Sequence, residues 1–304
     1  MPENRFCHLC GCRIYGDCYA FHHKEWSTEK ALCVCADCLK NKPRCKVCTL
    51  PIAFPSPNGL CNTCNSSLKY CLVCGDAVGK KHFEFDFRKP YCSKCVEIKK
   101  PCDHCGAPLT KESWQISDDR RICAYCHSMA VFAPEQAQRK FLEIKMAAAE
   151  QLKIELNIPT GLILLNRHQL SEMIGSQFNA RQSDHSNAHR LDPARTLGLY
   201  VRRGIRRVIY VQTGLPQIVF AQVAAHELGH AWQKENCPLS KDDLVNEGFA
   251  EWVSYHILGY FGYRSEQKRM RDRQDIYGEG LAWALAIEEK QGATGVVEAC
   301  RHSI

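Results

Sequence analysis

Cysteine is almost absent from the second part of this 304-residue sequence: 19 of the 21 cysteines precede residue 127, and only Cys237 and Cys300 follow it. Long apolar runs are absent throughout, so no stretch of about 18 apolar residues could span a bilayer. The N-terminus, Met1 to Arg5, leads into the first cysteine pair without the apolar segment of a secretory signal. We therefore expect a cytoplasmic protein in a reducing compartment, with no membrane partner, whose cysteines bind metal instead of forming disulfides.

A basic stripe interleaved with aromatic residues, typical of nucleic-acid binding, is also absent. The formal charge of +7 counts every thiol as neutral. A zinc ion with four thiolates carries about −2, so four such sites and one zinc on neutral histidines bring the charge near about +1. This correction favours protein partners over nucleic acid.

Sixteen of the cysteines form eight Cys-x-x-Cys pairs, a spacing that presents two thiolates to one tetrahedral zinc ion. Consecutive pairs combine into four modules, with 24, 12, 17 and 17 residues inside the modules and six residues between neighbouring modules. The constant linker predicts a tandem LIM-like array with about four structural zinc ions. The predicted ligands are Cys7, Cys10, Cys35 and Cys38; Cys45, Cys48, Cys61 and Cys64; Cys71, Cys74, Cys92 and Cys95; and Cys102, Cys105, Cys123 and Cys126.

The long loop of the first module contains further possible ligands. They are Cys12, Cys18, His22, His23 and Cys33. Any of them could replace a predicted ligand, although surface thiols and loop histidines are the simpler interpretation. The exact ligands of this module therefore stay open at this point.

The composition changes near residue 130, which predicts zinc modules over residues 1–130 and a mostly helical α+β domain with a small antiparallel sheet over residues 131–304. The periodicity predicts helices at Pro134 to about Leu156, about Arg167–Ile174 and Leu215–Lys234, and strands at about Leu162–Leu165, Leu197–Val201 and Arg207–Gln212. Residues 175–195 read as an exposed loop, and His185 and His189 as loop histidines.

The Leu215–Lys234 helix contains the sequence His226-Glu227-Leu228-Gly229-His230. Positions four residues apart share one face of a helix, so both imidazoles can reach the same metal ion. Glu227 lies beside the metal without binding it, where a carboxylate can act as the general base. The two histidines and the glutamate therefore predict a zinc-dependent peptidase.

A second helix offers the third ligand. Glu247 follows His230 by 17 residues, and Glu251 lies four residues further on the same face. Either carboxylate could bind the metal while the other accepts the remaining N–H of a ligand histidine. Three protein ligands leave one position open, as in a catalytic zinc site.

The reaction also needs a donor for the developing oxyanion and a place for the substrate chain. Tyr277 is the leading candidate donor, followed by Tyr255 and His256. The Arg207–Gln212 strand is the most plausible place for substrate to bind by strand addition.

Several short motifs carry a family resemblance. They are Cys102-Asp-His-Cys105, Asp118-Asp-Arg-Arg-Ile-Cys123, Gly214-Leu-Pro216, Ala225-His-Glu-Leu-Gly-His-Ala-Trp232, Glu247-Gly248 and Tyr277-Gly278-Glu279-Gly280. With these motifs, over about residues 100–300, the chain resembles the ubiquitin-activated, LIM-domain-containing zinc metallopeptidases of plants that limit organ growth, and their bacterial relatives.

The resemblance implies LIM-like modules ahead of a gluzincin-type peptidase domain, with Glu247 as the third zinc ligand. Glu251, on the same helical face, is then left to accept the other N–H of a ligand histidine. It also implies regulatory proteins as substrates. The chain departs from the family in having four short zinc modules and no acidic ubiquitin-interacting helix at its start, so ubiquitin-related regulation stays open.

Three hypotheses follow. The first is an endopeptidase whose zinc array recruits protein substrates or a protein partner, with Zn²⁺ as cofactor. The second is a zinc-finger adaptor with an inert peptidase-like scaffold, and the third is a nucleic-acid-binding zinc protein.

Overall fold

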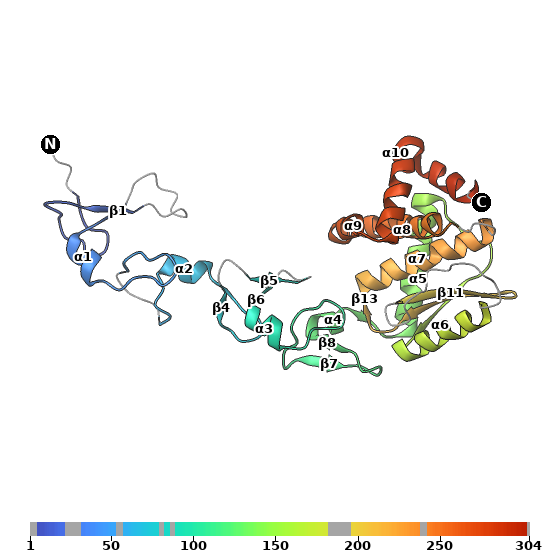
Figure 1. The fold of residues 1–304 in the computed structure, drawn as a ribbon, viewed down its shortest axis with the longest axis horizontal. Helices are drawn as coiled ribbons and strands as arrows, with labels where there is room; N and C mark the ends of the chain where they lie inside the picture. Colours follow the sequence, from blue (N-terminus) through green and yellow to red (C-terminus); the bar gives the residue numbers. More distant parts are fainter. Residues whose placement is uncertain are drawn as a thin grey trace. The chain divides into compact units, whose positions relative to one another are not determined.

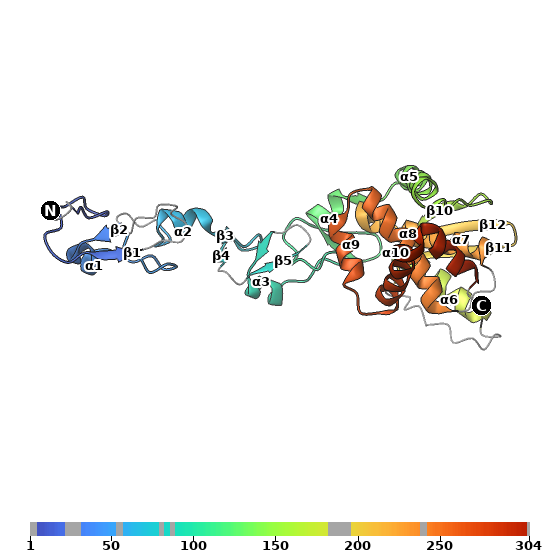
Figure 2. The same ribbon diagram turned by 90° about the horizontal axis from the view of Figure 1, so that it is seen from above.

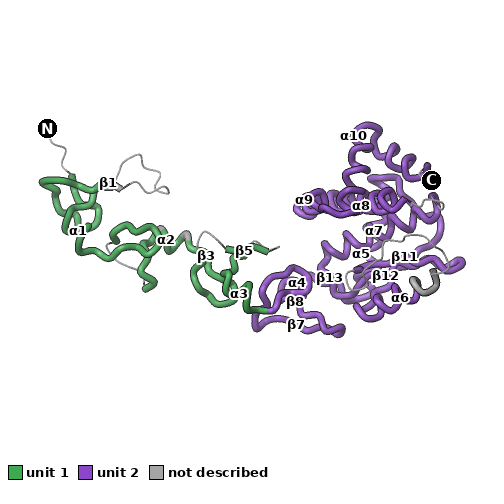
Figure 3. Tube along the Cα trace, in the orientation of Figure 1, with its two compact units in different colours: residues 1–99 green, residues 100–304 purple. Residues whose placement is uncertain are grey.

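The computed structural model describes residues 5–21, 32–52, 57–78, 82–85, 89–181, 196–237 and 242–302. The fold is α+β, with cysteine clusters and short hairpins followed by a mostly helical part, which confirms the predicted fold class (Figure 1). The chain divides into two compact units, residues 1–99 and 100–304 (Figure 3). The fourth zinc module therefore lies in the same unit as the helices. The functional division predicted near residue 130 stays a prediction.

The modules of the first unit share one tight turn. The N–H of the first cysteine donates to the carbonyl oxygen five residues on, at 2.8 Å in the pairs Cys7–Cys12, Cys45–Leu50 and Cys71–Asp76. The residue after the first cysteine pair takes a left-handed conformation, with φ of 72° at Gly11, 61° at Thr49 and 74° at Gly75. Since only glycine adopts such a φ freely, Thr49 is the strained member of the set.

A short helix follows the second cysteine pair in each of these modules. These helices are α1 (Ala36–Asn41), α2 (Asn62–Ser67) and α3 (Ser93–Ile98). The first cysteine of the pair is the N-cap, and its sulfur accepts a hydrogen bond from the N–H three residues on. Antiparallel pairs complete the unit: β1 (Tyr19–Phe21) with β2 (Leu32–Val34), β3 (Lys69–Tyr70) with β4 (Ala77–Val78), and β5 (Phe83–Glu84) with β6 (Pro90–Tyr91).

The fourth module repeats this structure at the start of the second unit. Its elements are β7 (Ser113–Gln115), β8 (Arg121–Cys123) and α4 (Ala124–Ser128), and Gly106 has a φ of 72°. Directly after α4, β9 (Ala130–Val131) pairs antiparallel with β13 (Leu215–Pro216). The fourth module is thus hydrogen-bonded to the segment that leads into α7 (Gln217–Asn236).

A buried ion pair strengthens this connection. Arg120 and Asp118 are each 1% exposed, and both guanidinium–carboxylate hydrogen bonds measure 2.8 Å. Arg120 Nη2 also donates to the carbonyl oxygen of Thr213 at 2.6 Å, while Asp118 accepts the backbone N–H of Arg167 at 2.8 Å. His104 Nε2 donates to the carbonyl oxygen of Gly214 at 2.9 Å. The module is therefore fixed to the turn that immediately precedes β13 and α7.

A three-stranded sheet lies beside α7. Its order is β10 (Gly161–Leu165), β12 (Arg206–Gln212) and β11 (Gly198–Arg203). The predicted antiparallel pairing holds for β11 with β12, whereas β10 is parallel to β12. In Figure 1, α6 (Arg167–Arg181) covers the side of the sheet opposite α7. Because β12 is paired on both sides, it cannot accept a substrate strand, and that prediction is wrong.

Helices α8 (Asp243–Tyr260) and α10 (Ile276–His302) pack with α7 and with α5 (Pro134–Leu152) around one core; α9 (Arg264–Arg271) joins α8 to α10 (Figures 1 and 2). Asp242 caps α8 by accepting the N–H groups of Leu244 and Val245. The backbones of α8 and α10 meet at Gly248 and Gly280, where a Cβ on Gly248 would lie 2.5 Å from the Gly280 carbonyl oxygen.

Several element boundaries differ from the predictions. Helix α5 ends at Leu152, because Lys153 takes a left-handed φ of 57°. Helix α6 continues to Arg181, so residues 175–181 of the predicted loop are helical. Their sequence ends in alanine and arginine, good helix formers that offset the weak propensities of the glycine, serine and asparagine before them. Residues 182–195, with His185 and His189, lie outside the described residues.

Among the described residues, none of the helices combines the length and the apolar character that crossing a bilayer requires.

Candidate metal centre

The predicted cysteines come together as four clusters whose four sulfur atoms all lie within 4.8 Å of one another. Each cluster has a sulfur–sulfur distance of 3.8–3.9 Å between its two Cys-x-x-Cys pairs: Cys10–Cys35, Cys48–Cys61, Cys74–Cys92 and Cys105–Cys123. Zinc–sulfur bonds of about 2.3 Å imply a tetrahedron with edges of about 3.8 Å, whereas a disulfide requires about 2.05 Å. These clusters therefore fit zinc and not disulfides.

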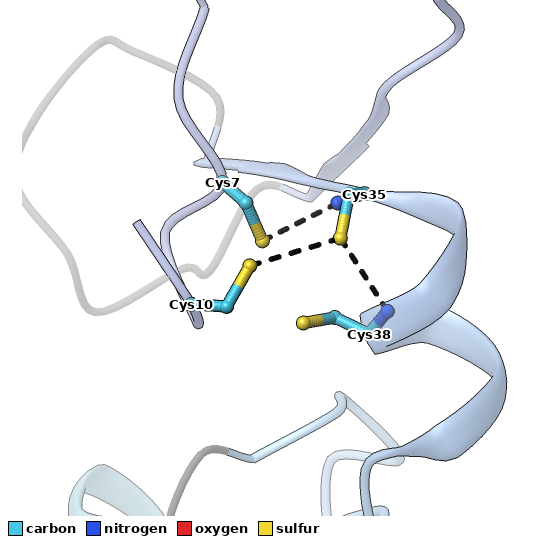
Figure 4. A group of neighbouring side chains, drawn as sticks. All are labelled: Cys7, Cys10, Cys35 and Cys38. Carbon is cyan, nitrogen blue, oxygen red and sulfur yellow. Dashed lines mark hydrogen bonds between the residues drawn. The ribbon is translucent and has the colours of Figure 1, made fainter. Parts of the chain in front are cut away.

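Figure 4 shows how the first module presents its sulfurs. The backbone N–H of Cys35 donates to the sulfur of Cys7, and that of Cys38 donates to the sulfur of Cys35, both at 3.4 Å. Hydrogen bonds of this kind, at the N-terminus of a helix, stabilise thiolate over thiol. The second and third modules repeat the helix-terminal bond, and the fourth repeats both bonds.

The alternative ligands of the first module lie apart from this cluster where the structure describes them. Cys18 and Cys33 form a separate pair with sulfurs 3.0 Å apart, and Cys12 is exposed. His22 and His23 lie outside the described residues. The geometry thus favours Cys7, Cys10, Cys35 and Cys38 as one set.

A fifth group contains His226, His230 and Glu247. The two Nε2 atoms are 3.0 Å apart, and Glu247 Oε2 lies 3.3 Å from His226 Nε2 and 3.5 Å from His230 Nε2. Zinc bonds to nitrogen and oxygen of about 2.0–2.1 Å imply ligand separations of about 3.3–3.4 Å. The three donor atoms are therefore spaced as zinc ligands are.

The chemistry of these donors also fits a cation. Glu247 Oε2 is buried and has no hydrogen-bond partner among the described residues. Burial alone would raise the pKa of Glu247, but the nearby His230 and His226 bring it below the usual range of glutamate. A buried carboxylate that stays ionised, facing two imidazole nitrogens, would be expensive to leave without a positive partner. The role of these three residues as ligands stays a prediction, which the geometry supports.

Glu251 and Gln233 lie on the outer side of the two imidazoles. Glu251 Oε1 is 3.2 Å from His226 Nδ1 and 3.8 Å from an Arg273 nitrogen, so it faces the imidazole atom that points away from Glu247. Gln233 lies 2.9 Å from His230 Nδ1. Of the two carboxylates considered from the sequence, Glu247 is therefore the one placed to bind the metal, and Glu251 the one placed to orient His226.

Glu227 is held by the neighbouring strand. The backbone N–H of Tyr200, on β11, donates to Glu227 Oε2 at 2.8 Å. Gly198 makes room for the same side chain, because a Cβ at that position would lie 2.9 Å from Glu227 Cγ and Oε1. Burial raises the pKa of Glu227, against the opposing effect of the two histidines. The carboxylate is thus fixed through one oxygen beside the metal donors.

Tyr277 lies at the same site, with its ring centre 5.9 Å from that of His226. Arg273 stacks over the tyrosine ring at 4.5 Å and also binds Asp275, whose carboxylate accepts the N–H of Gly278. Burial raises the pKa of Tyr277 to about 12, so the phenol keeps its proton at neutral pH. The other candidate donors differ: Tyr255 is buried in the core, and His256 binds Glu288 at 2.9 Å.

Sequence reasoning missed four contributors: the Tyr200 N–H, Gly198, Gln233 and Arg273. A backbone N–H carries no residue signature, and Gly198 reads as an ordinary strand-end glycine. Arg273 looks like part of a solvated basic run. Only Gln233 has a sequence signal, because it lies three residues after His230 on the same helical face.

The fold and these donor groups define an α+β protein in which an array of four-cysteine zinc-binding modules precedes a helical unit with a His/Glu group that could hold a metal ion. The chain is similar to Protein DA1-related 1 from Arabidopsis thaliana, at 23% identity over 67% of this chain and 38% of the relative. It is also similar to Protein DA1-related 2 (22% identity, 84% of this chain, 49% of the relative) and Protein DA1-related 7 (23%, 86% and 52%) from the same plant. These consistent matches support a DA1-like family for the chain.

The chain spans about half the length of these relatives, or less. No family model matches the sequence, and no solved structure matches it.

Proposed function

We propose that this protein is a zinc-dependent endopeptidase that cleaves protein substrates at the site formed by His226, His230, Glu247 and Glu227. The observation that carries the proposal is the fixed position of Glu227: a buried carboxylate, held through one oxygen by the Tyr200 N–H, beside three donors spaced as zinc ligands. A structural zinc site needs no such carboxylate, whereas hydrolysis needs a general base at this position. The sequence resemblance to LIM-domain-containing zinc metallopeptidases supports the same assignment.

A zinc ion at His226, His230 and Glu247 would supply Lewis-acid chemistry, polarising a carbonyl and lowering the pKa of water. The residues of the chain supply the rest. Glu227 Oε2 is occupied by the Tyr200 N–H, which leaves Oε1 to take a proton from the attacking water and to deliver it to the amine of the leaving peptide. Tyr277, protonated at neutral pH, can donate a hydrogen bond to the developing oxyanion.

Substrate backbone would bind along β11. This strand pairs with β12 on one side, and the N–H of Tyr200 points away from β12 toward Glu227. Because strands expose alternate N–H and C=O groups on each edge, Gly198 and Arg202 present theirs on the same side as Tyr200. An extended peptide added to this edge would lie beside the general base.

The Glu227→Gln variant tests the proposal. It keeps the size of the side chain and its acceptor oxygen but removes the base, so we expect an unchanged zinc content and a loss of cleavage of about 10²–10⁴-fold. The measurement compares protein fragments produced from a cell extract by the native and variant proteins. Arg206→Gln, on β12 away from the site, is the matched control and should cut normally.

Identical fragment patterns from the native and Glu227→Gln proteins would refute the proposal and favour the adaptor hypothesis. Metal content adds a second test: we expect about five zinc ions per chain, and His226→Ala should lower that number by one. An unchanged number would show that no metal binds at this site.

A further inference from the structure

Gln233 connects the two helices that carry the predicted metal ligands. It lies one turn after His230 on α7, and its side chain is buried, with 3% exposure. The amide reaches His230 Nδ1 at 2.9 Å on one side and the backbone carbonyl oxygen of Asn246 at 3.0 Å on the other. It also lies 3.6 Å from the sulfur of Cys300 on α10.

The Asn246 contact decides which way the amide points. A backbone carbonyl oxygen can only accept a hydrogen bond, so the NH₂ group of Gln233 must face Asn246 and the amide oxygen must face His230. An oxygen at that position can only accept, so His230 Nδ1 must carry the proton. In the neutral ring, Nε2 is then the atom with the lone pair.

This tautomer is the one that the metal centre needs. His230 Nε2 is the nitrogen that lies 3.0 Å from His226 Nε2 and 3.5 Å from Glu247 Oε2. The opposite tautomer would place a hydrogen among these donors. Gln233 thus excludes a form of His230 that cannot bind metal there.

The same amide also fixes the third donor. Asn246 is the residue directly before Glu247, in the first turns of α8. The hydrogen bond from Gln233 therefore holds the α8 backbone at a set distance from α7, where Gly229 allows close approach: a Cβ there would lie 2.8 Å from Ala250 Cα.

We infer that Gln233 is a positioning residue of this centre, which selects the metal-binding tautomer of His230 and sets the spacing between the helices that carry His230 and Glu247. The inference rests on the proposed function only in taking these two residues as metal ligands. It does not require that the protein cleave anything.

Two substitutions separate the two parts of this role. Gln233→Met keeps the length of the side chain and removes both hydrogen bonds. Gln233→Glu keeps an acceptor for His230 Nδ1 but loses the donor to Asn246. The matched control is Asn236→Leu, one turn on along α7; among the described residues, its side chain donates to the Trp232 carbonyl oxygen at 2.9 Å.

Two readouts are measured on the full chain. The first is the dissociation constant of the zinc ion that is missing from the His226→Ala protein, by competition with a chelator. The second is the tautomer of His230 in protein without that ion, from long-range ¹H–¹⁵N correlations identified by their absence in His230→Ala.

We expect Gln233→Met to raise the dissociation constant by about 10–100-fold and to leave His230 as a mixture of tautomers. Gln233→Glu should keep the tautomer and raise the constant by about several-fold, while Asn236→Leu changes neither readout. A constant within twofold of the native one, with the native tautomer, in Gln233→Met would overturn the inference. Should that variant not fold, an unchanged constant in Gln233→Glu would overturn it equally. A native protein that binds this zinc yet cleaves no protein would refute the proposed function and leave the inference standing.

Discussion

The first three zinc modules and the fourth share one local structure but have different surroundings. In the first unit each module has a small core built largely from its own cysteines, such as Cys7, Val34 and Cys38 in the first. The fourth module adds a buried ion pair, Asp118–Arg120, whose remaining hydrogen bonds go to Thr213 and Arg167. One zinc motif can therefore stabilise only its own module or can also support the structure packed against it.

The fourth module supports the candidate metal centre through α7. The fourth module fixes Thr213 and Gly214, and β9, which follows it directly, pairs with β13. Strand β13 runs directly into the helix that carries His226 and His230. The first three modules remain candidates for recognising substrates or partners. The fourth is part of the structure that positions the candidate site.

The largest expected difference concerns zinc ligands. Cys105→Ser should abolish the fourth zinc site and lower the melting temperature of the helical unit by roughly 10 °C. Without the zinc site, buried interactions worth about 3–5 kcal/mol are lost. Each kcal/mol shifts the melting temperature of a unit of this size by about 2–4 °C. Cys74→Ser should cost one zinc ion and leave that transition unchanged. Calorimetry with zinc analysis measures both.

Equal effects of the two substitutions on the helical unit would show that the third and fourth modules do not differ in this respect. If the melting temperature of the helical unit is unchanged in both variants, the fourth module does not stabilise that unit.

Arg120→Met tests the ion pair. It leaves the Asp118 carboxylate buried without its partner, so the free energy of unfolding of the helical unit should fall by about 3–5 kcal/mol. The double variant Asp118→Leu/Arg120→Met should recover much of this loss, since no buried charge remains unpaired. Urea denaturation gives the values, and a double variant no better than the single one would argue against the pair.

Acidification should act on the same carboxylate. Burial alone would raise the pKa of Asp118, but Arg120 and the Arg167 N–H outweigh it and leave the pKa below the usual value. A lowered pKa means that the contribution to stability is complete above the unfolded-state value of about 3.9 and is lost as the pH falls through the folded-state value. The native protein should therefore lose stability more steeply than Asp118→Asn as the pH falls below about 4. Acid releases zinc from both proteins, so the difference between their slopes is the quantity to measure.

The smallest expected effects concern the turn after the first cysteine pair. Thr49→Gly should stabilise the second module by about 1 kcal/mol, because it relieves a left-handed φ that costs non-glycine residues about 1–2 kcal/mol. It should slow zinc release to a chelator without changing the melting of the helical unit. Gly106→Ala makes the opposite change in the fourth module and should lower that melting temperature by a few degrees. A change in the helical unit on Thr49→Gly would contradict the separation of the modules.

Much of this molecule follows from local rules of the sequence. The spacing of the Cys-x-x-Cys pairs predicted four clusters, and the structure assembles the same four sets. The reason is that a Cys-x-x-Cys turn places both sulfur atoms within reach of one metal ion. Likewise, the i, i+4 spacing of His226 and His230 brought their nitrogens to 3.0 Å.

The sheet was harder to predict. The three strands were expected in nearly the right places, but the central position of β12 and the parallel pairing of β10 were not. Strand order depends on contacts between segments far apart in the sequence. The alternation of apolar and polar residues within one strand does not encode those contacts.

The side chains that could bind metal are predictable from the sequence, since ligand type and spacing are local properties. Three features follow only from the packing of the folded chain: the fourth module joins the helical unit, the Tyr200 N–H holds Glu227, and Gln233 orients His230. These are contacts of backbone groups and buried amides across elements. Their physical basis is that buried polar groups must find partners, and only the packed chain determines which partners are within reach.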